Sequence, residues 1–253
     1  MLCRKGTLGK KWIFIPIGIL LITVCACILY VNDYYRSEVN LQDYVKKNTV
    51  VQLTEIKDGL FLDGEGRGSA IIFYPGAKVE YTAYLPLFYE LALQGVDCFL
   101  MKMPGNLAIL GMNKAENIME NYDYESWYLA GHSLGGAMAA SYASENLTEV
   151  EGIVLLAAYP TASLRSEDFS VLSLYGSEDM VLNQEKLTEG RMHMPVNYEE
   201  IKIEGGNHAW FGNYGEQEGD GQALITREEQ QAQTIEAILE LVEGSMVQEA
   251  ENK

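Results

Sequence analysis

Short apolar runs alternate with helix-like stretches along most of this chain of 253 residues. The runs are bounded by glycine or proline and are almost wholly apolar, so neither face of such a strand is suited to water. Strands of that kind occur in parallel sheets that helices cover on both sides. The pattern therefore predicts an α/β fold with strands at residues 70–74, 96–103, 127–130, 153–158, 171–175 and 198–203.

The stretches between these runs predict helices. Pro86 suits the first turn of one helix, and Gly95 supplies its stop before the next strand. Two earlier strands meet at a turn at Asp58-Gly59. Only residues 159–170 separate two of the later runs, which leaves no room for a large lid. We expect further helices at residues 115–122, 135–143, 184–189 and 227–242, within a domain at 49–243 that is followed by a polar tail at 244–253.

An uncharged apolar segment stands close to the N-terminus, at residues 12–31. At about 1.5 Å of rise per residue, a helix of this length spans the bilayer core, which is about 30 Å thick. Basic residues precede the segment and acidic residues follow it, and this asymmetry favours a cytoplasmic N-terminus. We therefore expect a single-pass membrane protein with a cytoplasmic basic tail at residues 1–11, a transmembrane helix at 12–31, a stalk at 32–48 and an extracytoplasmic domain.

Two other interpretations of this segment stay open. One is a cleaved signal that ends at Ala26, with Cys27 as a lipid-modified first residue, and the other is the core helix of a soluble protein. The apolar run continues through residues 28–31, beyond that cleavage point. This continuation favours an uncleaved helix that attaches the chain to a membrane.

Acidic residues outnumber basic ones by 36 to 18, and the formal net charge is −18. Four of the basic residues precede residue 12, so the rest of the chain is still more acidic than this total. Such a domain repels phosphate backbones, which argues against nucleic acid as a partner. The sequence contains no Walker A loop, no H-E-x-x-H and no C-x-x-C, and we expect neither a cofactor nor a metal.

The segment Gly131-His132-Ser133-Leu134-Gly135 has the G-x-S-x-G pattern of a nucleophile elbow. It follows an apolar run directly and opens a stretch rich in glycine and alanine, as the strand-to-helix turn of this motif requires. Glycines on both sides let the backbone turn sharply, so the Ser133 hydroxyl stands clear of the sheet. The helix N-terminus favours negative charge there, and the Leu134 N–H is a candidate oxyanion donor.

A serine hydroxyl needs a base to remove its proton, and the chain contains three histidines. His132 is next to Ser133, and neighbours on a tight turn point their side chains apart. His193 lies between a helix and a strand, where a solvated loop histidine is the simpler interpretation. His208 follows the last apolar run, at the strand end where open α/β sheets build their sites, so we take His208 as the base.

A third triad member is expected between the serine and the histidine in the chain. The run at residues 171–175 is followed by Gly176-Ser177-Glu178-Asp179, which offers Asp179, with Glu178 as the alternative. A carboxylate there would orient the imidazole of His208. Ser133, Asp179 and His208 then occur in the order that is typical of α/β hydrolases.

The loop after the run at residues 70–74 is expected to supply a second oxyanion donor. Ala77 is the first choice, because a small residue allows close approach of the backbone, and Lys78 is the alternative. Lys78, Lys102 and Asn106 follow strand ends at the edge of the site. We treat these three as candidate substrate-binding residues, and the two lysines would favour a substrate that carries a carboxylate.

Five segments together resemble those of one known family: residues 74–79, 102–108, 131–136, 176–179 and 205–215. The resemblance is to the α/β-hydrolase fold-5 family, near its dienelactone-hydrolase-like branch, and it covers residues 50–242. It implies the α/β-hydrolase fold, a mostly parallel sheet with helices on both faces, and a Ser-Asp-His hydrolase with Ser133, Asp179 and His208 at the motif positions. Dienelactone hydrolases have a cysteine at the elbow, so their ring-opening reaction is not implied.

The expected function is that of a membrane-tethered serine hydrolase that cleaves a small carboxylic ester outside the cytoplasm. The same residues would serve an acyltransferase or a peptidase, because the choice of acceptor depends on the shape of the pocket. A non-catalytic binding protein on the hydrolase fold is the alternative from another class.

Overall fold

The computed structural model describes residues 11–47, 50–66 and 68–251, and it divides into two units, Met1–Tyr34 and Tyr35–Lys253. Residues 1–10, which account for most of the expected basic tail, lie outside the described residues. Helix α1 (Lys11–Asn32) belongs to the first unit, and its 18 residues Ile15–Asn32 contain no charged side chain. The 22 residues of α1 rise about 33 Å, so α1 is long and apolar enough to span a membrane, a property that signal sequences share.

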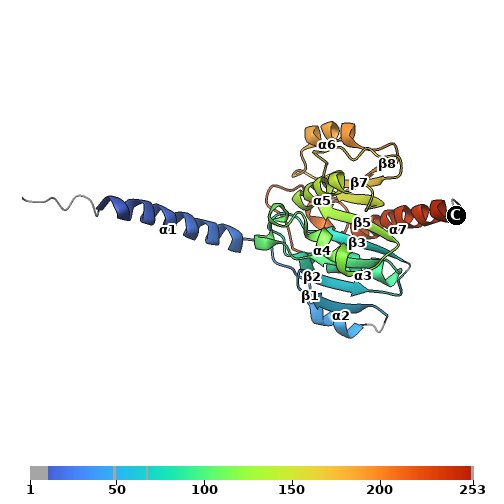
Figure 1. The fold of residues 1–253 in the computed structure, drawn as a ribbon, viewed down its shortest axis with the longest axis horizontal. Helices are drawn as coiled ribbons and strands as arrows, with labels where there is room; N and C mark the ends of the chain where they lie inside the picture. Colours follow the sequence, from blue (N-terminus) through green and yellow to red (C-terminus); the bar gives the residue numbers. More distant parts are fainter. Residues whose placement is uncertain (1–10, 48–49, 67, 252–253) are drawn as a thin grey trace, which may run out of the picture. The chain divides into compact units, whose positions relative to one another are not determined.

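The second unit contains a sheet whose eight described strands run in the order β1-β2-β4-β3-β5-β6-β7-β8 (Figure 1). The pairs β1–β2 and β2–β4 are antiparallel, and every other neighbouring pair is parallel. This confirms the predicted α/β fold with a mostly parallel sheet. The strands are β1 (Gln52–Ile56), β2 (Gly59–Asp63), β3 (Ser69–Tyr74), β4 (Asp97–Met101), β5 (Ser126–His132), β6 (Gly152–Leu156), β7 (Ser170–Gly176) and β8 (Tyr198–Ile203).

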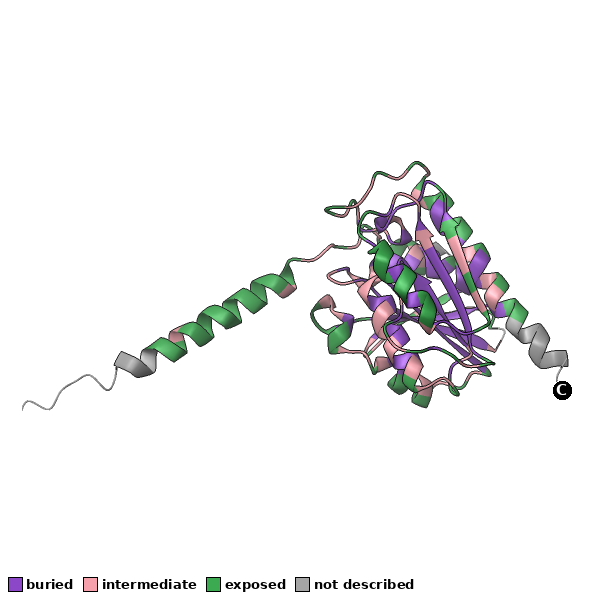
Figure 2. Cartoon of the chain, turned by 90° about the horizontal axis from the view of Figure 1, so that it is seen from above, coloured by how far each residue is buried: buried purple, intermediate pink, exposed green. Residues whose placement is uncertain are grey.

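Helices cover both faces of this sheet. Helices α3 (Leu85–Leu93) and α7 (Arg227–Glu251) pack in one hydrophobic core, and α4 (Lys114–Asn121) and α5 (Leu134–Glu145) pack in the core on the other face. Figure 2 shows the buried strands between helices whose buried residues face inward. The remaining helical segments are α2 (Leu41–Lys47), α6 (Gln184–Gly190) and the 3₁₀ turns η1 (Tyr81–Tyr84), η2 (Pro104–Asn106), η3 (Ala108–Leu110), η4 (Arg191–His193) and η5 (Ala209–Phe211).

Strand β3 illustrates why the sequence pattern identified the sheet. All six of its residues are buried, with Ile71 and Phe73 in the α3/α7 core and Ile72 and Tyr74 in the α4/α5 core. Burial of each large apolar side chain contributes roughly 1.5–3 kcal/mol. A polar residue at any of these positions would face a helix rather than water, so the run is continuously apolar.

The segment that we expected to be a stalk packs on the second unit from Tyr35 onward. The Tyr35 N–H donates to the Lys78 carbonyl at 2.7 Å, and the Glu80 N–H donates to the Tyr35 carbonyl at 3.0 Å. Farther along, the ring of Tyr44 in α2 meets that of Tyr89 edge-on, with centroids 5.0 Å apart. Tyr35, Val39, Leu41 and Tyr44 of this segment pack against the α3/α7 core, whereas Val45 is exposed.

The C-terminal boundary also differs from the expectation. Helix α7 continues through Gly244 to Glu251, into the segment that the sequence indicated as a polar tail. One glycine costs a helix only about 1 kcal/mol, and the residues that follow are mostly good helix formers without proline. Between β6 and β7 the described chain forms no helix, in agreement with the prediction that no large lid is present.

Candidate active site

Ser133 occupies a sharp turn between β5 and α5. Its backbone has φ 52° and ψ −124°, a conformation that residues other than glycine rarely adopt. A Cβ on Gly135 would lie 2.2 Å from the Tyr74 carbonyl oxygen, and one on Gly136 would lie 2.5 Å from the Ala158 Cβ. Glycine at both positions therefore lets the strand and the helix approach closely enough to hold this strained turn.

Asp179 and His208 form a buried pair at the ends of β7 and β8. The His208 Nδ1 lies 2.8 Å from the Asp179 Oδ2, and both side chains are almost fully buried. The other carboxylate oxygen accepts the N–H groups of Val181 and Leu182 at 2.9 and 2.7 Å. The alternative candidate Glu178 instead accepts a hydrogen bond from its neighbour's hydroxyl. With Nδ1–H directed at a carboxylate, the neutral imidazole of His208 has its Nε2 free to accept a proton.

Ser133 and His208 line one cavity of about 390 Å³. The His208 Nε2 is buried and has no hydrogen-bond partner among the described residues, so no hydrogen bond joins it to the Ser133 hydroxyl in this structure. Such bonds are often long in the absence of substrate. Apart from His208, the lining has no ionisable side chain except the phenol of Tyr159, and it comprises Ser133, Leu134, Ala137, Met138, Ala157, Ala158, Tyr159, Thr161, Val181, Leu182, Asn183 and His208.

The backbone N–H groups of Ala77 and Leu134 have no acceptor among the described residues. Leu134 lines this cavity, whereas Ala77 is not part of its lining. The Lys78 N–H, our alternative to Ala77, donates to the Asn106 carbonyl at 2.7 Å and is therefore engaged. Lys78 and Asn106 both have positive φ, 58° and 56°. The contact between these two turns holds the Ala77 loop against the segment that follows β4.

The candidate substrate-binding residues lie outside the cavity lining described above. The Lys102 side chain is exposed, and its backbone N–H donates to the Asp58 carbonyl at 2.8 Å. Asn106 and Lys78 are half-buried and contact one another through their backbones. The structure therefore brings Ser133 and His208 together on one cavity but leaves these three residues beyond its walls.

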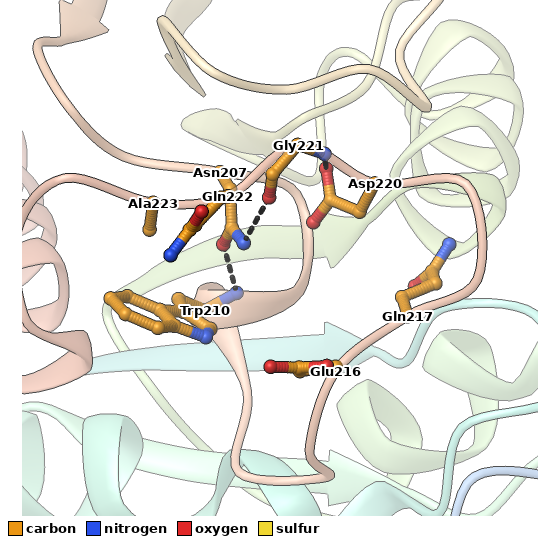
Figure 3. A pocket seen from close by; sticks show the side chains of 8 residues that line it. All are labelled: Asn207, Trp210, Glu216, Gln217, Asp220, Gly221, Gln222 and Ala223. Atoms are coloured by element: carbon orange, nitrogen blue, oxygen red, sulfur yellow. Dashed lines mark hydrogen bonds between the residues drawn. The ribbon is translucent and has the colours of Figure 1, made fainter.

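Asp220, which our sequence analysis did not identify, supports the backbone around His208. Its carboxylate accepts the N–H groups of His208 at 3.3 Å, Ala209 at 2.9 Å and Gly221 at 2.8 Å. Figure 3 shows this carboxylate at a neighbouring pocket of about 450 Å³. Asp220 follows no strand and belongs to no motif, so only its position in space reveals this role.

Asn207 and Gln230 hold the same loop from the side of α7. The Gln230 side chain donates to the Asn207 carbonyl and accepts from its N–H, both at 2.9 Å. The Asn207 side chain accepts from the Trp210 N–H at 3.1 Å and donates to the Gly221 carbonyl at 3.0 Å (Figure 3). Every polar group of Asn207 is thus paired, which fixes the backbone that leads into His208.

The other two histidines are not part of the cavity lining. His193 is half-buried in η4, where its carbonyl accepts from the Leu164 N–H at 2.8 Å. His132 is buried, and its Nε2 lies 3.0 Å from the His208 carbonyl oxygen. Burial, followed by the proximity of His208, lowers the pKa of His132 well below its usual value of 6.5. His132 is therefore neutral near pH 7. No cluster of three or more side chains suited to a metal ion occurs among the described residues.

Lowering the pH is expected to destabilise the protein through His132. In the unfolded chain this histidine takes up a proton near pH 6.5, whereas in the folded protein its pKa is well below that value. The free energy of unfolding therefore falls below about pH 6.5, by about 1.4 kcal/mol per pH unit from this group. Urea unfolding of the wild type and of His132→Asn, measured from about pH 8 to pH 5, checks this expectation. Equal pH slopes for the two proteins would contradict it.

Comparisons with known proteins agree with this architecture. The model of the alpha/beta hydrolase family matches residues 70–232, and no curated protein sequence gives a significant match. Alpha/beta hydrolase domain-containing protein 10 from mouse aligns with a TM-score of 0.55 and 12% identity over 78% of this chain and 99% of that chain. Est1E from Butyrivibrio proteoclasticus aligns with a TM-score of 0.53 and 14% identity over 77% of this chain and 99% of that chain.

A third solved structure, TT1662 from Thermus thermophilus, has a TM-score of 0.52 and 15% identity over 63% of this chain and 91% of that chain. At such identities these likenesses show a common fold. The family model is a stronger finding, because it covers more than half of the sequence and supports a hydrolase. The chain belongs to the alpha/beta hydrolase family.

Proposed function

We propose that this protein is a serine hydrolase that cleaves carboxylic esters. The observation that carries the proposal is the buried Asp179–His208 pair, whose free Nε2 lies on the same cavity as Ser133 at its strained turn. A carboxylate that holds an imidazole, together with a serine hydroxyl, makes up the parts of an acyl-transfer site. Membership of the alpha/beta hydrolase family supports the same reaction class.

In the proposed mechanism the His208 Nε2 removes the Ser133 proton as the Ser133 Oγ attacks the ester carbonyl. The negative charge on the tetrahedral oxygen is stabilised by the N–H groups of Ala77 and Leu134. His208 then gives its proton to the departing alcohol, which leaves an acyl-serine. Water, activated by the same histidine, releases the acid and restores Ser133. Asp179 keeps the imidazole oriented and stabilises its charged form.

The cavity lining favours an uncharged acyl group. Its side chains are mainly apolar, and neither lysine nor arginine is among them. With a net charge of −18 on the whole chain, an anionic acyl group would meet no compensating charge inside the cavity. Lys78, Lys102 and Asn106 are then candidate contacts only for a part of the substrate that stays outside it.

We also propose that the enzyme acts at a membrane on its extracytoplasmic side. Helix α1 is long enough to be the anchor, and basic residues stand before it in the sequence. Protease protection in sealed vesicles tests this topology. Digestion of the hydrolase domain from the cytoplasmic side would contradict it.

Hydrolysis of matched chromogenic substrates tests the proposed function and its acyl preference together. The full-length protein in detergent is expected to cleave p-nitrophenyl butyrate at least about tenfold faster than p-nitrophenyl succinate, because the succinyl carboxylate would be buried without a partner. Butyryl p-nitroanilide should be a poor substrate. Faster cleavage of the anilide would indicate a peptidase, and no turnover of any of the three by the folded protein would favour a non-catalytic binding protein.

A further inference from the structure

A chain of hydrogen bonds next to Ser133 joins two loops and the end of one strand. The Gly76 N–H donates to the Tyr84 hydroxyl at 3.2 Å, and the Tyr84 hydroxyl lies 2.8 Å from the His132 Nδ1. The His132 Nε2 lies 3.0 Å from the His208 carbonyl oxygen. The loop after β3, the end of β5 and the loop after β8 are thus connected through two buried side chains.

The direction of these bonds follows from simple chemistry. A carbonyl oxygen can only accept, so the His132 Nε2 carries the hydrogen and donates to His208. Burial lowers the pKa of His132, which keeps the ring neutral and leaves its Nδ1 as an acceptor. Burial raises the pKa of Tyr84, so its hydroxyl keeps its proton and donates it to the His132 Nδ1. Each donor has one acceptor, and the network has a single arrangement.

The network leaves little room for displacement. A Cβ on Gly76 would lie 2.8 Å from the His132 Nδ1, closer than real Cβ atoms come to any other atom. The rings of His132 and His208 have centroids 4.5 Å apart, and those of Tyr84 and Phe73 are equally close. The side chains of Tyr84 and His132 are therefore held by packing as well as by hydrogen bonds.

Each anchored backbone point is at or next to one part of the proposed machinery. Gly76 precedes Ala77, whose N–H is a proposed oxyanion donor, and His132 precedes Ser133. The third point is the carbonyl of His208 itself. A shift of one member of the network would therefore change the distance between the oxyanion donor, the nucleophile and the base.

We propose that Tyr84 and His132 are positioning residues that set the spacing of Ala77, Ser133 and His208. This inference rests on the proposed function, and neither side chain needs to touch the substrate. A neutral His132 also suits this place, because a charged ring beside His208 would oppose the imidazolium that forms during catalysis. Misplacement of these three groups by a fraction of an ångström raises the energy of the transition state more than that of the bound substrate. We therefore expect a lower kcat and an unchanged KM.

Tyr84→Phe is the first test, with Tyr74→Phe as its matched control. Tyr74 is an equally buried tyrosine, and its hydroxyl donates to the Met112 carbonyl at 2.5 Å and accepts from the Ala115 N–H at 3.0 Å. Each variant loses one buried hydroxyl that joins two segments, but only Tyr84→Phe loses the link between Gly76 and His132. With p-nitrophenyl butyrate we expect Tyr84→Phe to lower kcat at least about tenfold at constant KM, and Tyr74→Phe to change kcat less than about twofold.

Two replacements of His132 separate its bonds. Glutamine can place an N–H near the Nε2 position and keep the bond to the His208 carbonyl, whereas asparagine can place an acceptor near the Nδ1 position and keep the bond to Tyr84. If Tyr84 acts through His132, Tyr84→Phe should lower kcat much less in the His132→Gln background than in the wild type. Additive effects of the two changes would overturn the proposal.

Hydrogen exchange gives a readout that does not depend on turnover. Amides at residues 76–80 and 205–211 should exchange faster in Tyr84→Phe than in Tyr74→Phe if the network positions both loops. Equal exchange in the two variants would overturn the positioning role, as would an equal loss of kcat. Faster exchange in a protein that hydrolyses no ester would support the positioning role and reject the proposed function instead.

Discussion

Replacing Ser133 by alanine is expected to lower kcat for p-nitrophenyl butyrate by roughly 10⁵- to 10⁶-fold and to abolish labelling by a fluorophosphonate probe. The probe reacts only with a serine whose proton a neighbouring base removes, and His208 shares its cavity with Ser133. Intact mass before and after labelling measures the adduct, and peptide mapping locates it. The fold should be unchanged, because alanine adopts the strained backbone of this turn no less readily than serine.

Ser141→Ala is the matched control for this experiment. Ser141 lies two turns farther along α5, and its hydroxyl donates to the Ala137 carbonyl at 3.0 Å, away from His208. It should retain wild-type labelling and turnover. An adduct that persists in Ser133→Ala, or that maps to another serine in the wild type, would reject Ser133 as the nucleophile.

Asp179→Asn is expected to lower kcat by about 10⁴-fold with little change in KM. The Asp179 Oδ1 accepts two backbone N–H groups, so an asparagine would keep its oxygen there and turn its NH₂ toward the His208 Nδ1. That contact makes Nδ1 the acceptor and leaves the hydrogen on Nε2. The imidazole is then in the wrong tautomer to take a proton from Ser133.

Glu178→Gln distinguishes the two carboxylates that the sequence offered. The Glu178 side chain bonds to its own neighbour, and Asp179 is the one in contact with His208. Steady-state kinetics of Glu178→Gln should therefore stay within about twofold of the wild type. A large loss of kcat in Glu178→Gln, together with wild-type kcat in Asp179→Asn, would exchange the proposed roles of the two residues.

Strands β3 to β7 could be predicted from the sequence, because burial on both faces leaves an unmistakable apolar run. Strand β3 is the clearest example, with all six residues buried. Strand β8 is only half-buried and contains three charged residues. The segment from Tyr35 to the end of α2 could not be assigned to the domain in this way. Its residues Tyr35, Val39, Leu41 and Tyr44 pack against the α3/α7 core, and their spacing follows no period along the chain.

Candidate site residues were recognisable where local geometry demands a particular residue type. The glycines around Ser133 are of this kind, because strand and helix approach too closely there for a Cβ. Asp220, Gln230 and Tyr84 left no comparable signal. They bond to the backbones of His208, Asn207 and Gly76 from other segments of the chain, and any chain position could in principle have supplied those groups.

The sequence by itself determined the α/β fold class, the place of the strand-to-helix turn at Ser133, and the order of Ser133, Asp179 and His208. These are properties of local periodicity and of chain order. Only the tertiary structure decided that Asp179 rather than Glu178 meets His208, that the Lys78 N–H is occupied, and that His132 bridges two loops. Each of those outcomes depends on which backbone groups meet across the carboxyl edge of the sheet, and that is set by the packing of all its strands together.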